Sequence, residues 1–420
     1  MYKIIMNENP LTATFDGFLR GDGRRGVRNW LVVAYTVYCA EHVARRIAEP
    51  FRLKGVQLIG FDQCYPSDYG HELMERLLTH SNVGAVLLVS LGCEEFRRSD
   101  LLAAVRASGR EVRSIVIQET GGTEKSIDAG QAIISEILPR LETTTRAPMT
   151  AADLVIGLEC GGSDALSGIT ANPAVGLFTD RLIDAGGTAI IEETNELFGC
   201  ETHLAARART PEVGEAVQRT IKKAMDYHRQ LGHASFGGGN ITGGLSTIEE
   251  KSAGAYAKCG TRPLDGILIP GQRPSGTGLY LLDTVYDSDL RHGIPNIHDP
   301  HGVTAMAACG CHLIVFTTGR GSVVGQAVSP VIKVASNSAM YQRLAGDMDV
   351  NAGIAIETPD GLQAAVEEIT RIVARAAAGG QTRSEALGHM ESYISDGYFK
   401  PGPGVCRNPA EADKTLTLQH

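Results

Sequence analysis

Short apolar runs along the chain alternate with longer stretches in which apolar positions recur every three or four residues. The apolar runs, about four to seven residues long, predict buried strands, and the amphipathic stretches predict helices. In the first third of the chain, strands are predicted at 31–37, 56–61, 85–91 and 112–117, and helices at 40–48, 70–79, 99–108 and 123–138. This regular alternation is typical of a doubly wound, mostly parallel sheet.

The alternation resumes after LETTTRAP at 141–148, a threonine-rich segment closed by a proline that predicts a linker. Later strands are predicted at 154–158, 188–191, 265–269, 312–316 and 330–334, and helices at 173–184, 211–231, 247–258 and 362–378. We therefore expect two or more doubly wound, mostly parallel α/β domains with the site at the carboxyl ends of the strands. The expected division is a lead-in at 1–16, a first α/β domain at 17–145, a second α/β region at 146–400 that a boundary near 260 could divide, and a tail at 401–420.

Composition narrows the class of protein. A net charge of −9 and a pI of about 5.8 argue against nucleic acid as the main partner, because phosphate binding needs a basic face. No apolar run reaches the roughly 18–20 residues of a membrane span, and the first residues do not form a signal peptide. The nine scattered cysteines are typical of a reduced, cytoplasmic protein whose thiols are free or bound to metal.

Four cysteines share one position in the pattern. Cys39, Cys64, Cys93 and Cys160 each come at or just after the end of a predicted strand. Since the carboxyl ends of parallel strands meet at one edge of a sheet, these thiols could converge and hold a soft or borderline metal or an iron–sulfur cluster. The alternative is that each packs as a small apolar side chain.

Carboxylates and a hydroxyl accompany these strand ends. Glu94 follows Cys93, and the stretch LVIGLECGGSDALSGITANPA at 154–174 brings Glu159, Ser163 and Asp164 next to Cys160. Glu192 and Glu193 follow the strand predicted at 188–191. These carboxylates could supply harder oxygen ligands or proton transfer.

Arginines point to an anionic ligand. The glycine-rich motif GDGRRGVRN places Arg24, Arg25, Arg28 and Asn29 just before the first strand, and TTGRG places Arg320 after a later one. Guanidinium groups bind carboxylates through two parallel hydrogen bonds, so both motifs are candidate carboxylate clamps. The alternative for each is a charged surface turn.

Other motifs are weaker. GGGNITGG at 237–244 is predicted to be a loop but lacks the P-loop lysine, and the chain has neither a dinucleotide fingerprint after the first strand nor a G-x-S-x-G nucleophile motif. HDPH at 298–301 is predicted to be a loop with a possible ligand role, and CGCH at 309–312 is interpreted as tightly packed structure.

Several long stretches resemble the altronate/galactarate dehydratase family, specifically its large catalytic part. They are GFLRGDGRRGVRNWLVV with TVYCA, SLGCEE, ECGGSDALSGITANPAVG, EETNELFG, GNITGGLSTIEEKSAGA, FTTGRGSVVGQAVSPVIKVASN and DVNAG. The resemblance implies a metal-dependent lyase, typically iron-dependent, that acts on hydroxylated sugar acids in carbohydrate catabolism. In the family the large part is often joined to, or paired with, a small SAF-type domain. Because this chain starts almost at once with the large part, a separate small subunit is a possible partner, and a homo-oligomer is also expected.

One departure from the family pattern bears on substrate choice. In many members the second strand ends in a histidine shortly before a Gly-Cys pair, whereas this chain reads GFDQCYPSD and keeps only Cys64.

From the residues and the resemblance together we predict a hydro-lyase that converts a polyhydroxy sugar acid, such as altronate or galactarate, into a 2-keto-3-deoxy acid. The cofactor is predicted to be a divalent metal, Fe2+ first, with Mn2+ or an iron–sulfur cluster as alternatives. The predicted metal ligands are Cys64, Cys93, Cys160, Glu94 and Glu159; the substrate-binding residues are Arg24, Arg28, Asn29, Ser163 and Arg320; and the catalytic residues are Glu193, Asp164 and Lys251. Two alternatives stay open: a sulfolactate sulfo-lyase large subunit, and a non-catalytic subunit that requires a small partner.

Overall fold

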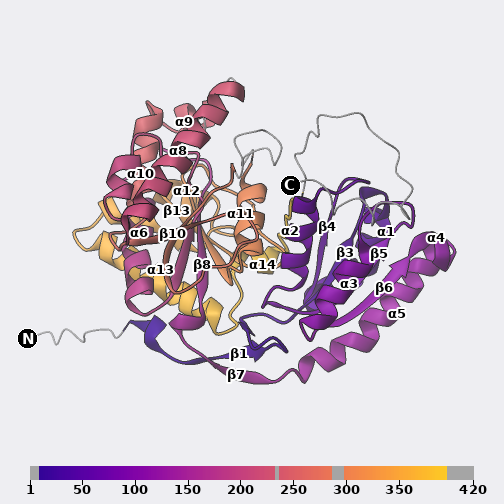
Figure 1. The fold of residues 1–420 in the computed structure, drawn as a ribbon. Helices are drawn as coiled ribbons and strands as arrows, with labels where there is room; N and C mark the ends of the chain where they lie inside the picture. The colour runs from indigo at the N-terminus through magenta and orange to yellow at the C-terminus, as the bar shows by residue number, and fades with distance from the viewer. Residues whose placement is uncertain (1–8, 232–235, 286–297, 395–420) are drawn as a thin grey trace, which may run out of the picture.

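The computed structural model describes residues 9–231, 236–285 and 298–394. Two α/β lobes lie side by side, one built from the first third of the chain and the other from the remainder (Figure 1). Both contain a parallel sheet with helices on its two faces, so the predicted fold class is confirmed. None of the helices within these residues is both long and apolar enough to cross a membrane.

The first lobe is built on a four-stranded parallel sheet with the order β4-β3-β5-β6. Its strands are β3 (Trp30–Tyr35), β4 (Val56–Gly60), β5 (Val83–Ser90) and β6 (Glu111–Val116), and its helices are α1 (Glu41–Ala48), α2 (Asp68–Leu78), α3 (Arg98–Ala107), α4 (Ile117–Thr120) and α5 (Thr123–Glu142). Val32 and Ala34 of β3 pack toward α2 and α3, whereas Leu31 and Val33 pack toward α1 and α5. Alternate residues of a strand face opposite sides, so this sheet is covered on both faces.

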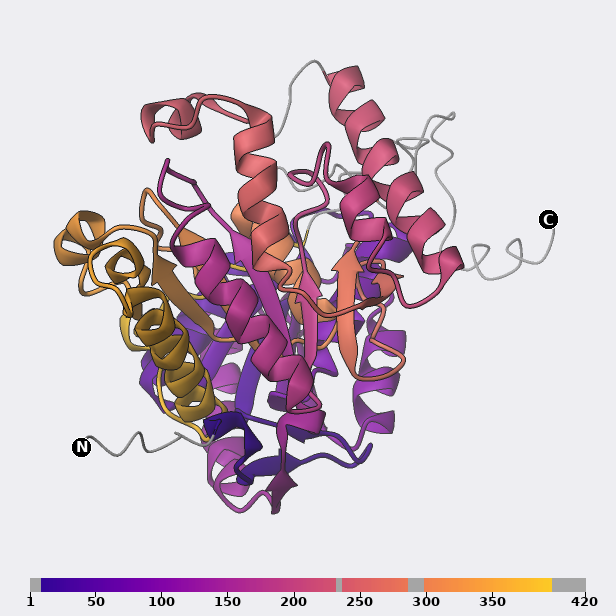
Figure 2. The same ribbon diagram turned by 90° about the vertical axis from the view of Figure 1, so that its left-hand side faces the viewer.

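The second lobe is built on a seven-stranded parallel sheet with the order β10-β11-β9-β8-β12-β13-β14. Its strands are β8 (Val155–Cys160), β9 (Thr188–Ile191), β10 (Leu264–Leu268), β11 (Gly278–Leu282), β12 (Leu313–Thr318), β13 (Val331–Ala335) and β14 (Val350–Asn351). Its helices are α6 (Ala171–Asp184), α7 (Glu201–Ala205), α8 (Pro211–Leu231), α9 (Gly238–Thr242), α10 (Ile248–Lys258), α11 (Asp299–Ala308), α12 (Ser338–Arg343), α13 (Gly361–Ala377) and α14 (Arg383–Leu387). Figure 2 views this lobe from the side of α6, α10 and α13.

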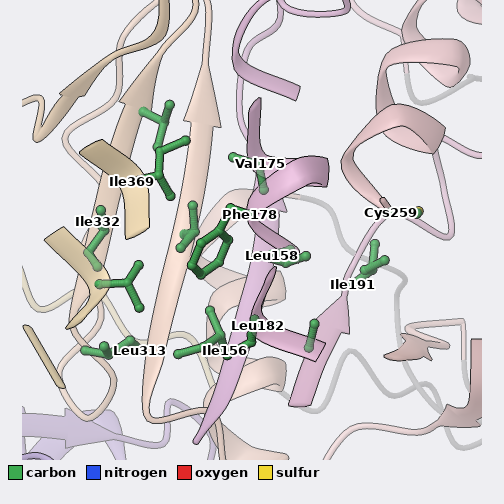
Figure 3. Packing of buried hydrophobic residues seen from close by; sticks show 14 of the residues in the cluster. Ile156, Leu158, Val175, Phe178, Leu182, Ile191, Cys259, Leu313, Ile332 and Ile369 are labelled. Atoms are coloured by element: carbon green, nitrogen blue, oxygen red, sulfur yellow. The ribbon is translucent and has the colours of Figure 1, made fainter. Parts of the chain in front are cut away.

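The largest hydrophobic core lies between this sheet and α6, α8, α10 and α13. In Figure 3 Phe178 of α6 lies among Leu158, Leu182 and the neighbouring strands, and all three side chains are fully buried. On the other face of the sheet, α11 packs through Val303 and Met306. Burial of both faces explains why these strands read as continuous apolar runs.

A three-stranded antiparallel sheet connects the lobes. It has the order β2-β1-β7, with β1 at Phe15–Leu19, β2 at Arg25–Gly26 and β7 at Arg146–Met149. The segment predicted to be a linker therefore ends in a strand, because its residues complete a sheet with the start of the chain. Five 3-10 turns, at 10–12, 38–40, 49–54, 151–153 and 352–356, complete the described elements.

Helices α2 and α11 pack against each other across the boundary between the lobes. Ile394 forms a bridge with Phe61, just after β4, and the neighbouring Tyr393 N–H donates to Thr304 Oγ1 of α11 at 3.0 Å. At the far ends of the same helices, Leu77 and Ala308 share one apolar cluster. The two helices therefore run in the same direction, which turns the carboxyl edges of both sheets to the same side of the molecule.

Two predictions of irregular structure are wrong. Part of GGGNITGG forms the short helix α9, and HDPH begins α11. His298 caps that helix by accepting the His301 N–H, and Pro300 occupies the first turn, where a missing N–H is harmless. The strands β1, β2, β7, β11 and β14 and the helices α4, α7, α9, α11, α12 and α14 were not predicted.

Candidate active site

A buried group of ionisable side chains lies at the carboxyl edge of the seven-stranded sheet. Glu159 comes from the end of β8, and Glu192 and Glu193 directly follow β9, its hydrogen-bonded neighbour. Helix α10 and the start of α11 supply the remaining members. We call this group the acid–lysine cluster and define it as Glu159, Glu192, Glu193, Glu196, Lys251, Lys258 and Asp299.

The two lysines come from one face of α10. Lys251 and Lys258 are seven residues apart, which is almost two full turns of an α-helix. Lys258 Nζ donates to Glu193 Oε1, and both side chains are almost completely inaccessible. Lys251 Nζ lies 3.2 Å from Glu196 Oε1. The helix thus brings two ammonium groups to the carboxylates that follow β9.

Glu159 and Glu192 form a carboxyl pair. The two side chains share a hydrogen bond, and Thr284 Oγ1 also donates to Glu192 Oε1 at 3.0 Å. Burial, and then the charges of Glu196 and Glu193, raise the pKa of Glu192 to about 8. Burial and the neighbouring Glu192 raise the pKa of Glu159 well above its usual range. Two adjacent buried carboxyls cannot both ionise easily, so the pair retains a proton at neutral pH.

Glu193 is poised differently from that pair. Burial raises the pKa of Glu193 to about 7, although the charge of Lys258 opposes this shift. Its second oxygen, Oε2, is buried and has no hydrogen-bond partner among the described residues. Burial opposes any rise in the pKa of the two lysines, but Cys160 and Glu193 outweigh it at Lys258, and Glu196 and Cys160 outweigh it at Lys251, so both pKa values are raised. Glu193 is therefore a basic group beside a permanent positive charge at neutral pH.

Cys160 and Ser163 border the cluster. Cys160 Sγ lies 3.1 Å from Ser163 Oγ, and the Ser163 N–H donates to Asn240 Oδ1 of α9. Burial raises the pKa of the Cys160 thiol, and the charge of Lys258 partly offsets this rise. This thiol is thus protonated at neutral pH.

Asp164 holds the loops around the site together. Its Oδ1 accepts from Ser167 and Ser336, and its Oδ2 accepts from Asn337 at 2.7 Å. These contacts tie the loop after β8 to the end of β13. Both oxygens are engaged, so the observed contacts position the loops, and the predicted catalytic role of Asp164 stays a prediction.

Arg320 lies on the rim of the same edge. Its backbone N–H donates to the Gly162 carbonyl at 3.1 Å, which holds the loop after β12 against the loop after β8. The Arg320 side chain is exposed. Of the predicted site residues, the structure therefore brings Glu159, Cys160, Ser163, Asp164, Glu193, Lys251 and Arg320 to one edge of one sheet.

The other predicted metal ligands lie at the carboxyl edge of the four-stranded sheet. Cys64 and Cys93, like Cys39, are exposed there, after three adjacent strands. Partial desolvation, followed by the neighbouring Cys39 and Cys93, raises the pKa of the Cys64 thiol. The Glu94 carboxylate accepts hydrogen bonds from Thr36 and the Gly92 N–H, which lower its pKa although partial burial opposes them.

The five predicted ligands do not form one coordination shell in this structure. Cys64, Cys93 and Glu94 follow strands of one sheet, whereas Glu159 and Cys160 end a strand of the other. Within the residues that the structure describes, no three His, Cys, Asp or Glu side chains are gathered in a way that could hold a metal ion. The ligand set stays a prediction, and no chemical step below depends on it.

Arg24, Arg28 and Asn29 lie at the opposite, amino edge of the four-stranded sheet. The Arg28 guanidinium makes a bidentate pair with Glu385 and also donates to the Ala376 and Gly380 carbonyls, so it fastens the second lobe to the first. Asn29 donates to the Leu141 carbonyl. Their predicted role as a carboxylate clamp stays untested, and the contacts observed for Arg28 and Asn29 are structural.

Sequence reasoning missed Lys258 and Glu196, although it placed Lys251 of the same helix among the catalytic residues. The structure exposes Glu249 and Glu250 but buries Lys251. The seven-residue spacing of Lys251 and Lys258 was the available signal, because it places both on one side of a helix. Nothing local marks that side as the buried one.

Comparison with known proteins covers most of the chain. Residues 17–142 match the second domain of D-galactarate dehydratase/altronate hydrolase, and residues 151–399 match the C-terminal domain of D-galactarate/altronate dehydratase.

Individual relatives align over nearly the full length of this chain. An altronate dehydratase of Bacillus subtilis (strain 168) is 33% identical over 96% of this chain and 81% of its own. An altronate dehydratase of Escherichia coli (strain K12) is 31% identical over 92% of this chain and 77% of its own. The (2R)-sulfolactate sulfo-lyase subunit beta of Chromohalobacter salexigens is 30% identical over 91% of this chain and 97% of its own. The chain therefore belongs to the D-galactarate/altronate dehydratase family and is an enzyme of the lyase class, a hydro-lyase.

Proposed function

We propose that this enzyme dehydrates a polyhydroxy sugar acid of the altronate or galactarate type to a 2-keto-3-deoxy acid. The single observation that carries the proposal is the acid–lysine cluster, in which a basic Glu193 and a protonated carboxyl pair lie side by side. Dehydration needs both functions, because one proton leaves carbon 2 and another must reach the departing hydroxyl on carbon 3.

Glu193 is the proposed general base. Its carboxylate removes the proton from carbon 2, and negative charge develops on the substrate carboxylate as an enediolate. The ammonium group of Lys258, bonded to Glu193, favours this anionic state, and Lys251 adds a second positive charge. Because these charges are buried, their fields are weakly screened by water.

The Glu159–Glu192 pair is the proposed general acid. Its shared proton passes to the carbon 3 hydroxyl, the carbon–oxygen bond breaks and water departs. The enol product then tautomerises: carbon 3 gains a proton and the carbon 2 hydroxyl loses one, which gives the 2-keto-3-deoxy acid. Ser163 and Arg320, at the rim, are proposed to hold the hydroxyl and carboxylate groups of the substrate.

The decisive experiment is an assay of the purified chain against a panel of hexonic and hexaric acids, with 2-keto-3-deoxy acid formation as the readout. Turnover of one member, lost in Glu193→Gln, is expected. An absence of turnover on every sugar acid would contradict the proposed function.

A second candidate function rests on the sulfo-lyase subunit beta, which aligns over 97% of its own length. In that case the same proton abstraction would expel sulfite rather than water. Measuring sulfite release from sulfolactate beside keto-acid formation separates the two. The word subunit in that relative's name also supports the proposal of a small separate partner, which co-purification would test.

Iron dependence is a separate proposal, because the five predicted ligands are divided between two sheets. Exhaustive chelation with anaerobic dialysis tests it. Loss of activity that Fe2+ restores is expected, and full activity after metal removal would contradict it.

A further inference from the structure

The amino edge of the first lobe carries a concentration of positive charge that the proposed reaction does not use. Arg24 comes from the turn between β1 and β2, Arg76 from the last turn of α2, Arg110 from the residue before β6, and Arg273 from the connection between β10 and β11. We call these four residues the seam arginine cluster, because they lie where the two lobes meet.

Contacts with neighbouring residues place the members from both lobes close to one another. Arg24 Nη2 donates to the Thr79 carbonyl, three residues beyond Arg76. A Cβ added at Gly271, two residues before Arg273, would lie 3.4 Å from Arg76 Cγ. A Cβ added at Gly310 would lie 3.9 Å from Arg273 Cγ, which places Arg273 beside the end of α11. Arg110 Nη2 donates to the His80 carbonyl, in the same turn as Thr79.

The acidic side chains around the cluster do not neutralise it. Asp22 is shared between Arg24 at 2.6 Å and Arg110 at 3.0 Å. Among the residues that the structure describes, Glu72 pairs with Arg76 alone. Within that part of the chain, two carboxylates therefore face four guanidinium groups.

Arg273 is the unsatisfied member. Within the described part of the chain it has no salt bridge and no side-chain hydrogen bond, and its buried Nε lacks an acceptor, as does the Nε of Arg76. Burial, and then the charges of Arg24 and Arg76, lower the pKa of Arg273 to about 10. An unpaired guanidinium among like charges is costly unless an anion completes the arrangement.

We propose that Arg24, Arg76 and Arg273 of the seam arginine cluster bind a small phosphate-type oxyanion, either free phosphate or the phosphate group of a small metabolite, between the two lobes. Arg110, whose three nitrogens already donate to protein acceptors, adds positive charge behind them. The fork of N–H donors on arginine matches the oxygens of phosphate, and several arginines can grip one group. The Arg24 and Arg76 side chains are 26% and 35% exposed, so a solute can reach them. Because its ligands come from both lobes, the anion would fasten the lobes together.

Thermal unfolding and calorimetric titration with inorganic phosphate and with ribose 5-phosphate test this site. Phosphate at millimolar concentration is expected to raise Tm beyond NaCl of equal ionic strength, and Arg273→Gln to weaken binding at least about tenfold. Arg273→Gln leaves no protein acceptor unpaired, and Arg76→Gln serves as a second variant if the first folds poorly. Stabilisation by the ester alone would identify a phosphorylated metabolite as the ligand.

Two controls distinguish this site from others. Arg219→Gln removes an exposed arginine on α8, and it should bind phosphate like the unaltered protein. Arg320→Gln reports on phosphate bound at the candidate active site. The proposal would be overturned if Arg273→Gln and Arg76→Gln both bound phosphate as tightly as the unaltered protein. It would also be overturned if only Arg320→Gln lost phosphate binding. Neither measurement requires turnover, so a failure of the proposed dehydration would leave this test intact.

Discussion

The carboxyl edges of the two parallel sheets occupy equivalent positions in their lobes, but they differ in the ionisable groups that they carry and in how deeply these groups are buried. The edge of the seven-stranded sheet buries the acid–lysine cluster, and burial raises the pKa values of its carboxyls. The edge of the four-stranded sheet exposes three thiols, and hydrogen bonds lower the pKa of its Glu94. Topology decides where polar groups gather, whereas the depth of burial decides which protonation states they hold.

Among substitutions at the two edges, the largest expected effect is on catalysis, from a change in the acid–lysine cluster. Glu193→Gln should lower kcat about 10²–10⁴-fold with a small change in KM, because it removes the proposed general base while its amide oxygen can still accept the Lys258 hydrogen bond. Steady-state kinetics on the sugar acid that the enzyme accepts measures this. Glu249→Gln, on the exposed side of α10, is the matched control and should keep normal kcat. Equal kcat in both variants would place the base elsewhere.

The pH dependence of kcat sharpens the same contrast. Glu193 must be deprotonated, with a pKa of about 7, and Glu192 must be protonated, with a pKa of about 8. The rate should therefore rise as pH approaches about 7 and fall above about 8, giving a narrow bell. In Glu192→Gln, the pH above which kcat falls should change. A rate that is flat from pH 6 to 9 would contradict these assignments.

The two edges should also affect stability in opposite directions. The folded pKa of Glu192 lies above its unfolded value, so its contribution is present at low pH and is lost as pH rises toward about 8. The folded pKa of Glu94 lies below its unfolded value, so its contribution is present at neutral pH and is lost as pH falls into the acid range. Relative to the unaltered protein, Glu192→Gln should gain stability toward alkaline pH, and Glu94→Gln should lose stability at neutral pH. Chemical denaturation at several pH values measures both, and parallel pH profiles for the two variants would refute the contrast.

The smallest expected effect is at the thiols. Cys64→Ser, at an exposed position, should change the free energy of unfolding by no more than about 0.5 kcal/mol. Cys311→Ser, in a fully buried position, should cost more, because it buries a hydroxyl. Urea unfolding compares them. If Cys64→Ser keeps its stability but loses activity together with bound iron, the two edges act as one site.

Local patterns located most of the regular elements. The strand at Thr188–Ile191 and the helix at Pro211–Leu231 were predicted at their observed bounds, because a buried strand and an amphipathic helix leave strong marks on local sequence. The strand β11 lies in the glycine-containing stretch GLYLL and was missed, since only its pairing with β9 and β10 defines it. The two-residue strands β2 and β14 are likewise defined only by their pairing with β1 and β13.

The chemistry of the site also divides into features that local sequence determines and features that tertiary packing decides. Sequence alone determined that thiols and carboxylates would follow the strands and that the chain resembles sugar-acid dehydratases, because strand ends and long motifs are properties of adjacent residues. Only the tertiary structure decided that Lys258 meets Glu193, that Cys64 and Cys93 belong to a different sheet from Glu159, and that Arg28 joins the lobes rather than lying in the acid–lysine cluster. Those outcomes depend on which elements pack together, and on how deeply, across large distances in the chain.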